Sequence, residues 1–214
     1  MLIPDGSRSQ WKWIRHDLCL WNAPPLLRQV IRLRPHYQDC ENLFTKVLGI
    51  KQASLDEVVH EFCSESRGNK KSALQRFEKL LLMLADFLSK SGRGLTVSEL
   101  ARIRTASVFP VLQKGEVSQE DPVIVWRSIR DGGWYIPDKI MLENLFRGKI
   151  DMLGMSVRLL IKSSRLLGAL FTALGCTTML VSSSVRQTIE LRGNIVRDLQ
   201  METDLKIRVE HISQ

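Results

Sequence analysis

The sequence predicts an α+β protein, mainly α-helical, with a small antiparallel sheet in the middle and helix-turn-helix units on both sides. Apolar residues recur at intervals of three and four over most of the chain, a spacing typical of amphipathic helices. The clearest apolar runs of strand length lie between residues 106 and 138. Glycine, proline and serine separate these segments, as they do at helix ends and in turns.

The composition is that of a globular chain. Hydrophobic residues make up 44% of the 214 positions and charged residues 25%, so a core can be buried and disorder of the whole chain is not expected. We expect a loose leader at residues 1–18, a helical region at 19–105, a small β-containing region at 106–155 and a C-terminal helical region at 156–214. Residues 19–192 are expected to form one compact domain.

Two helices are expected directly after the leader. The first begins at residues 22–25 (NAPP), because proline is tolerated in the first turn of a helix. It ends at Pro35, because the residue before a proline is pushed out of the helical region. The second covers residues 39–48 and ends at Gly49, the residue type that most often follows a helix.

Two further helices precede the sheet. One starts at Ser54, where Glu57 three residues later makes the sequence pattern of a capping box. The other, at residues 73–89, keeps the most regular apolar period in the chain. The short segment 98–105 is ambiguous between helix and loop.

The sheet is expected from short apolar runs. Residues 107–112 contain Pro110, which lacks a backbone N–H, so this run is predicted to be an edge strand or the end of one. Residues 131–133 (DGG) predict a turn that leads into a second strand at 134–136. Residues 123–126 and 149–155 are candidates for further strands.

Three helices are expected after the sheet, at residues 140–146, 158–174 and 182–191. Gly148 and Gly175 end the first two. Residues 166–185 carry no charge, so a membrane span is an alternative. Hydroxyl residues and Gly175 dilute that segment and favour a buried helix, a turn and a second helix. We therefore expect no membrane span.

The charge balance allows an anionic partner. The net charge is +8, from 31 Lys and Arg against 23 Asp and Glu, which favours nucleic acid, acidic proteins or a membrane surface. The basic residues are scattered, however, and form no long block. Four well-separated cysteines and the lack of an apolar signal segment near Met1 predict an intracellular protein, cytoplasmic or nuclear, with reduced thiols.

Histidine and cysteine recur together three times, as His16/Cys19, His36/Cys40 and His60/Cys63. Imidazole and thiolate are the usual zinc ligands, so three or four of these side chains are a conceivable zinc site. Their spacings match no zinc-finger pattern, and ordinary half-buried side chains are the alternative. We assign no metal-binding residue.

Motifs for enzymatic chemistry are missing from the sequence. It contains no G-x-x-x-x-G-K-[ST] loop, no G-x-G-x-x-G turn after a strand and no G-x-S-x-G elbow. Cys176 and a histidine are a conceivable nucleophile and base, but nothing in the sequence brings them together. We assign no catalytic residue, no cofactor-binding residue and no cofactor, and we expect no ATP binding.

Two features relate to partner binding. Trp11, Trp13 and Trp21 are candidates for an exposed apolar patch that anchors a protein, although core packing is the commoner fate of tryptophan. Of the possible DNA-reading helices, residues 54–63 carry acids that would repel phosphate. Residues 182–191, with Arg186 and the following Arg192, are the better candidate.

Several ordered motifs resemble one known family. They run in order from Cys19 to about Val185: CLWNAP at 19–24, Tyr37-x-x-Cys40, Leu43-Phe44, Leu48-Gly49-Ile50, Ser54-Leu55, VFPV at 108–111, WYIPD at 134–138, Phe146-x-Gly148-Lys149-Ile150, and Leu170 followed by Leu174-Gly175. This order resembles an internal segment of large fungal proteins of the sacsin/NO VEIN type. The motifs are structural and moderately specific.

The resemblance implies a scaffold segment rather than a catalytic one. Members of that family carry a GHKL-type ATPase domain elsewhere, which needs an N-box asparagine with a nearby acid and a D-x-G-x-G loop. Neither pattern is in this sequence, so no nucleotide-binding residue carries over to any position here.

From these observations we expect a non-enzymatic scaffold or protein-interaction module with a protein partner. The alternative is a basic nucleic-acid-binding protein. An exposed apolar patch would favour the first, and basic residues gathered on one face would favour the second. The partner's identity and the oligomeric state stay open.

Overall fold

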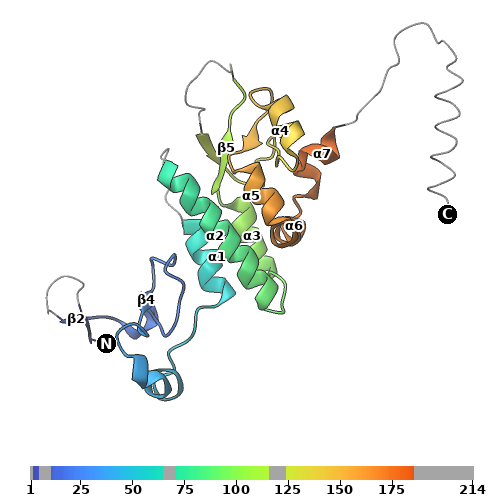
Figure 1. Cartoon of the computed structure of the whole chain (residues 1–214). Helices are drawn as coiled ribbons and strands as arrows, with labels where there is room; N and C mark the ends of the chain where they lie inside the picture. Colours follow the sequence, from blue (N-terminus) through green and yellow to red (C-terminus); the bar gives the residue numbers. More distant parts are fainter. Residues whose placement is uncertain (1, 5–10, 65–70, 116–123, 186–214) are drawn as a thin grey trace, which may run out of the picture.

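The computed structural model describes residues 2–4, 11–64, 71–115 and 124–185. Within them the fold is α+β and mainly helical, with a small three-stranded antiparallel sheet, as the sequence predicts. Figure 1 shows three levels: an N-terminal unit at one end, a group of long helices in the middle, and the sheet with the shorter helices at the other end.

The middle level confirms the predicted helices. Helix α1 (Leu55–Ser64) packs beside α2 (Lys71–Lys90), and α3 (Val97–Thr105) packs against α1. Phe62 and Phe77 meet across the α1–α2 interface with ring centroids 5.9 Å apart. These helices form because their apolar residues fall on one side, which is buried in the shared core.

Helix α3 resolves the ambiguity at residues 98–105. Thr96 and Glu99 make a complete capping box: the Thr96 hydroxyl accepts from the Glu99 backbone N–H, and the Glu99 carboxylate accepts from the Thr96 backbone N–H at 2.7 Å. At α1 the predicted box is half formed, because Glu57 accepts from the Ser54 backbone N–H at 2.8 Å while the Ser54 hydroxyl donates to the same carboxylate.

The sheet has the order β6–β5–β7, with β5 (Phe109–Leu112) in the centre, β6 (Ile124–Arg127) antiparallel on one side and β7 (Met152–Leu153) antiparallel on the other. The prediction that the Pro110 run is an edge strand is therefore wrong. The Gly154 N–H donates to the Pro110 carbonyl at 2.7 Å, and proline cannot return that bond. The β5–β7 ladder ends there, so a proline fits in this central strand.

The strand predicted at residues 134–136 is also not formed. Tyr135 and Ile136 make only single parallel bridges, to Met152 and Leu180. The preceding turn is confirmed, with Gly132 and Gly133 at φ values of 62° and 70° that favour glycine. The turn directs Trp134 into the core, where its Nε1–H donates to the Ser128 carbonyl at 3.1 Å.

The helix predicted from residue 22 to Pro35 is absent. Instead β3 (Cys19–Leu20) pairs in parallel with β4 (Ile31–Arg32). The backbone N–H groups of Arg28 and Gln29 donate to the Glu61 carboxylate on α1, so tertiary hydrogen bonds replace helical ones here.

The other N-terminal predictions hold in part. The helix predicted at 39–48 is divided into a 3₁₀ turn, η2 (Gln38–Cys40), and a π-helical turn, η3 (Leu43–Val47); Gly49 follows with φ 67°. In the predicted leader, β1 (Leu2–Pro4) pairs antiparallel with β2 (Trp11–Trp13). Another 3₁₀ turn, η1 (His16–Leu18), precedes β3.

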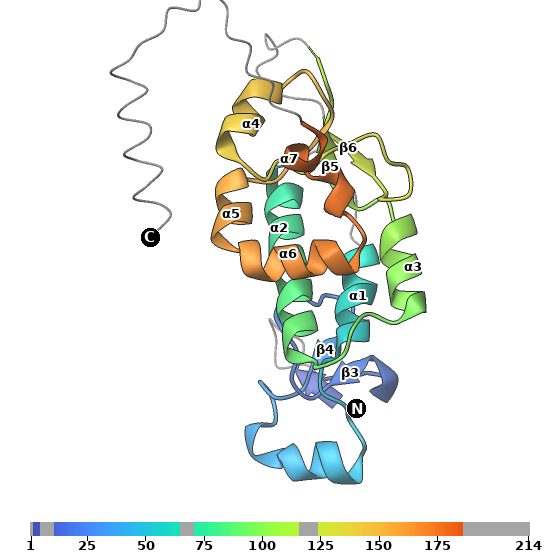
Figure 2. The same cartoon turned by 90° about the vertical axis from the view of Figure 1, so that its right-hand side faces the viewer.

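The C-terminal level differs from the prediction at two helices. Helix α4 (Ile140–Phe146) has the predicted bounds. The predicted helix 158–174 is two helices, α5 (Val157–Lys162) and α6 (Ser164–Ala173), which break at Ser163 so that α6 lies across α2 (Figure 2).

A 3₁₀ turn, η4 (Thr177–Met179), and the short α7 (Val181–Ser184) follow. The helix predicted at 182–191 ends at Ser184, because Val185 is extended, and residues 186–191 lie outside the described residues.

Three groups of buried side chains hold the levels together. The main core runs from Leu20 to Cys176 and joins α1, α2, α3, β5, α5 and α6. A second cluster fills the N-terminal unit (residues 11–54): Cys19, Trp21, Leu33, Phe44 and Ile50. The third lies under α4 and comprises Leu142, Met152 and Val181. Among the described residues no helix has the length and apolar character needed to cross a bilayer.

Candidate functional site

The structure does not bring the histidine–cysteine pairs together. His16 is exposed, whereas Cys19 is buried and its Sγ donates to the Arg15 carbonyl at 3.3 Å. Cys40 packs against the second cluster, whereas Cys63 on α1 packs against the main core. Across the described ranges, no group of three or more His, Cys, Asp or Glu side chains is placed to hold a metal ion.

The buried thiols are poorly ionised. Burial raises the pKa of Cys63 and of Cys176 to about 11, and burial also raises the pKa of Cys19. At pH 7 a thiol with such a pKa is thiolate in about one molecule in ten thousand. Because the thiolate is both the nucleophile and the metal ligand, these positions serve packing in this structure.

The buried charges are also structural. Glu61 and Arg76 pair at 2.5 Å between α1 and α2, with side chains only 6% and 10% exposed. Arg76 also donates to the Leu26 carbonyl at 3.1 Å. Together with the two backbone bonds that Glu61 accepts, this network attaches the loop between β3 and β4 to the helices.

A different part of the molecule has the character of a binding surface. Helix α4 is apolar nearly all round: Leu142 and Phe146 belong to the third cluster, while Ile140, Met141 and Leu145 remain 47%, 66% and 50% exposed. Met141 and Leu145 are one turn apart and therefore share a side of the helix. We call Ile140, Met141 and Leu145 the α4 face. A helix of this kind is usually covered on all sides.

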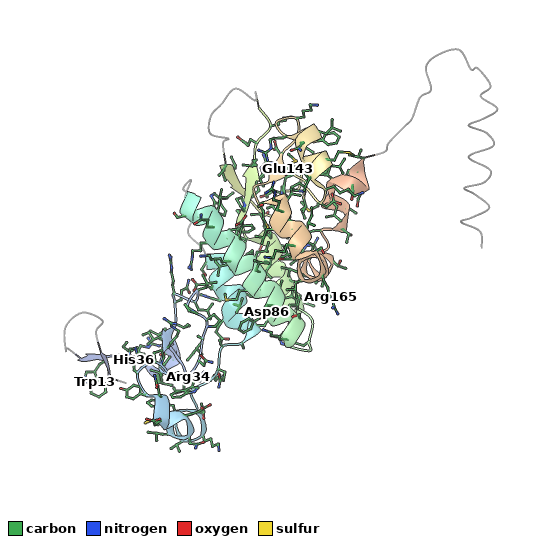
Figure 3. The ribbon with its side chains drawn as sticks, in the orientation of Figure 1. Trp13, Arg34, His36, Asp86, Glu143 and Arg165 are labelled. Atoms are coloured by element: carbon green, nitrogen blue, oxygen red, sulfur yellow. The ribbon has the colours of Figure 1, made fainter. Side chains whose placement is uncertain are left out.

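The surroundings of the α4 face are positively charged. Lys139 at its N-terminus and Lys149 just beyond its C-terminus are exposed. Of the nearby acids, Glu143 (labelled in Figure 3) pairs with Arg147, and Asp151 pairs with Arg127 at 2.9 Å. Asp138 accepts from the Ser182 backbone N–H at 3.1 Å and keeps its negative charge, so Lys139 and Lys149 leave the apolar surface with a small excess of positive charge among these residues.

Helix α4 itself is predicted by the sequence, but its exposed side is not. The four apolar residues at 140–142 and 145 predict a buried helix. Their spacing does not show that, of these four, only Leu142 is buried. The signal available in the sequence is that apolar residues occur on both sides of a short helix that is flanked by lysines.

The exposed apolar patch predicted around the N-terminal tryptophans is not formed as expected. Trp21 is 1% exposed and stacks on Phe44, with ring centroids 5.6 Å apart. Trp13 is 75% exposed (Figure 3), and the side chain of Trp11 lies outside the described ones. A second exposed apolar group, in the N-terminal unit, consists of Leu43, Val47 and Leu48, which are 48%, 74% and 49% exposed.

Basic side chains are unbalanced on α5 and α6. Residues 152–185 include no acid, and their charges are Arg158, Lys162 and Arg165, all exposed. Arg186 and Arg192, which the sequence favours for nucleic-acid contact, lie outside the described residues.

Comparison with known proteins adds one match. The family described as "Domain of unknown function (DUF8348)" matches residues 56–185, which is more than half of the chain and extends from α1 to the end of α7. The α4 face lies inside this range, and the second cluster lies outside it. No curated protein and no solved structure matches the chain.

Proposed function

The chain belongs to the DUF8348 family of domains of unknown function, and we propose that it is a non-enzymatic scaffold or protein-interaction module that binds a partner protein through the α4 face. The observation that carries the proposal is the exposure of Ile140, Met141 and Leu145 on one short helix. Exposed apolar side chains gathered on one helix and bordered by charge are typical of interaction sites.

The chemistry of the face defines the partner. Apolar side chains are needed to cover the three exposed residues, and acidic side chains are needed to meet Lys139 and Lys149. A short acidic, amphipathic segment satisfies both, with apolar anchors at helical spacing. Met141 suits such a role because its flexible, polarisable side chain adapts to different apolar surfaces.

Other features favour a non-catalytic role inside the cell. The cysteines are free, and those with a raised pKa are buried or partly buried, which fits packing in a reducing cytoplasm or nucleus. The motif order that resembles an internal segment of sacsin/NO VEIN-type proteins agrees with a scaffold role.

Selection from a displayed random peptide library on the full chain tests the proposal. The selected peptides are expected to be rich in leucine or aromatic residues at three- and four-residue spacing, with flanking Asp or Glu. Met141→Glu and Leu145→Glu should each weaken a selected peptide at least about tenfold, because each places a charge at the centre of the contact. Higher salt should weaken binding moderately.

Two matched variants serve as controls. Val97→Glu changes an apolar residue that is 86% exposed at the start of α3, and Val47→Glu changes one that is 74% exposed on η3. Both should leave peptide binding unchanged. Peptides that respond to Val47→Glu but not to Met141→Glu would overturn the proposal. So would concentration-dependent dimerisation that Met141→Glu abolishes, since it would assign the face to a second copy.

The alternative function, nucleic-acid binding, is favoured by one observation. Arg158, Lys162 and Arg165 are exposed on adjoining helices in a segment without acids. If the alternative holds, single-stranded RNA should bind with a steep salt dependence. The triple variant R158Q/K162Q/R165Q should reduce the slope of log affinity against log salt concentration by the equivalent of about three phosphate contacts. Salt-independent or undetectable RNA binding would contradict it.

A further inference from the structure

The N-terminal unit contains a polar pocket of about 420 Å³ that is separate from the α4 face. Its lining is formed by Asn22, Ala23, Arg32, Arg34, Pro35, Gln38 and Glu41. These residues lie outside the range matched by the family. A volume of this size is within the range of sites for small molecules.

Both arginines line the pocket from the end of β4: Arg32 is the last residue of the strand, and Arg34 lies in the turn that follows. Leu33, between them, is fully buried in the second cluster. The backbone is fixed by hydrogen bonds from Leu33 N–H to the Leu20 carbonyl at 3.0 Å and from Arg34 N–H to the Trp21 carbonyl at 2.9 Å.

The charge of the two guanidinium groups is not neutralised by an ion pair. Among the described residues neither Arg32 nor Arg34 forms a salt bridge within 4.0 Å, whereas Arg15, Arg76, Arg93, Arg102, Arg127 and Arg147 each do. Glu41 lines the same pocket without pairing to either arginine. The lining of the pocket therefore contains two guanidinium groups, two side-chain amides and one carboxylate.

We propose that this pocket binds the phosphate group of a small phosphorylated polar molecule. A carboxylate has two oxygens, which one guanidinium can satisfy, whereas a phosphate monoester has three terminal oxygens and accommodates two. Asn22 and Gln38 add amide donors, and Glu41 accepts from a hydroxyl or amino group elsewhere on the ligand. The pocket is formed by the N-terminal unit alone, so a result that refutes phosphate binding does not affect the proposal for the α4 face, and the reverse also holds.

Nuclear magnetic resonance of the arginine side chains of the full chain tests this proposal. Inorganic phosphate and ribose 5-phosphate are added in separate titrations, with acetate as the carboxylate probe. The Nε–H signals of Arg32 and Arg34 should shift with both phosphates, and ribose 5-phosphate should bind at least about fivefold more tightly because it also reaches the amides and Glu41. Acetate should produce no saturable shift.

Substitutions give the second readout. Arg32→Gln and Arg34→Gln should each weaken ribose 5-phosphate at least about tenfold. Arg28 is an exposed arginine that does not line the pocket, so Arg28→Gln should leave the affinity for ribose 5-phosphate unchanged. Saturation with acetate at the same affinity, equal loss in Arg28→Gln, or no shift with phosphate in the unsubstituted protein would overturn the proposal. Shifts with single-stranded RNA but not with ribose 5-phosphate would also overturn it.

Discussion

At the scale of single residues, almost all buried polar side chains that the structure describes are paired. Glu61 accepts from two backbone N–H groups and Arg76, and Glu99 from Arg93 and Thr96. Within the described part of the chain, the side-chain exception is the indole Nε1 of Trp126, which is buried without a hydrogen-bond partner. An unpaired buried donor costs about 1–3 kcal/mol, so this atom is a local weakness.

The two core tryptophans of the sheet region should respond differently to loss of the indole N–H. Trp134→Phe removes a buried bond to the Ser128 carbonyl and should cost about 2–3 kcal/mol of unfolding free energy. Trp126→Phe removes no bond and should cost less than about 1 kcal/mol. Urea denaturation of both variants checks this. Equal losses of unfolding free energy in the two variants would contradict the finding that Trp134 Nε1 is hydrogen-bonded and Trp126 Nε1 is not.

Glu61 should be among the residues most sensitive to truncation. Glu61→Ala removes the carboxylate that joins α1, α2 and the β3–β4 loop, and should cost about 3 kcal/mol or more. Asp56→Ala breaks an exposed ion pair with Arg102 and should cost less than about 1 kcal/mol. Denaturant unfolding measures both. A small effect at Glu61 would show that the network does not hold the loop.

Glu99 gives stability that depends on pH. The Arg93 guanidinium, together with the Thr96 hydrogen bonds, lowers the pKa of Glu99 from 4.5 to about 2. A folded pKa below the unfolded one stabilises the protein above pH 4.5, and this contribution is lost as the pH falls toward 2. Glu99→Gln should therefore be less stable than the unsubstituted protein at pH 6, by about 1–2 kcal/mol. The difference should shrink below pH 4; a constant difference down to pH 2.5 would be the contrary result.

At the scale of elements, the sequence predicts what local interactions decide. Helix α2 follows its own apolar period, and α4 starts and ends where predicted. The helix predicted from residue 22 to Pro35 does not form because Glu61, more than 30 residues away, accepts the N–H groups of Arg28 and Gln29. Pro110 fits in the central strand because its carbonyl accepts a hydrogen bond from the Gly154 N–H across the sheet. The break between α5 and α6 at Ser163 depends on the packing of α6 across α2. None of these partners is visible in the local sequence.

The same limit applies to the candidate sites. The sequence drew attention to histidine, cysteine and tryptophan, whose chemistry is recognisable from residue type alone. The α4 face and the Arg32–Arg34 pocket depend on which sides of α4 and of the segment 31–34 are covered, which only tertiary packing determines.

Two glycines test the packing of elements directly. A Cβ at Gly154 would lie 3.3 Å from the Pro110 carbonyl oxygen and 3.4 Å from the Leu112 side chain, between β5 and β7. At Gly168, exposed on α6, a Cβ would meet nothing within 4 Å. Gly154→Ala should destabilise by about 1 kcal/mol, whereas Gly168→Ala should stabilise by about 0.5–1 kcal/mol. Thermal denaturation measures both, and the opposite order would contradict the described packing.

At the scale of the whole molecule, two kinds of surface are carried by two parts of the chain. The range matched by the family contains the main core and presents the α4 face. The N-terminal unit has its own apolar cluster and the Arg32–Arg34 pocket, and it is attached to the helices through Leu20, Ala23, Leu27 and the Glu61–Arg76 network. In Figure 1 the unit and α4 lie at opposite ends of the molecule, so both can be occupied at once.

The central claim, that the α4 face is the partner-binding surface, is tested most directly by methionine methyl resonances during titration with a selected acidic peptide. Met141 is 66% exposed on the face, whereas Met152 and Met155 are 2% and 5% exposed in the interior. The account predicts that the Met141 methyl signal shifts and saturates with the peptide while the Met152 and Met155 signals stay in place. A saturating peptide that leaves Met141 unmoved would contradict it.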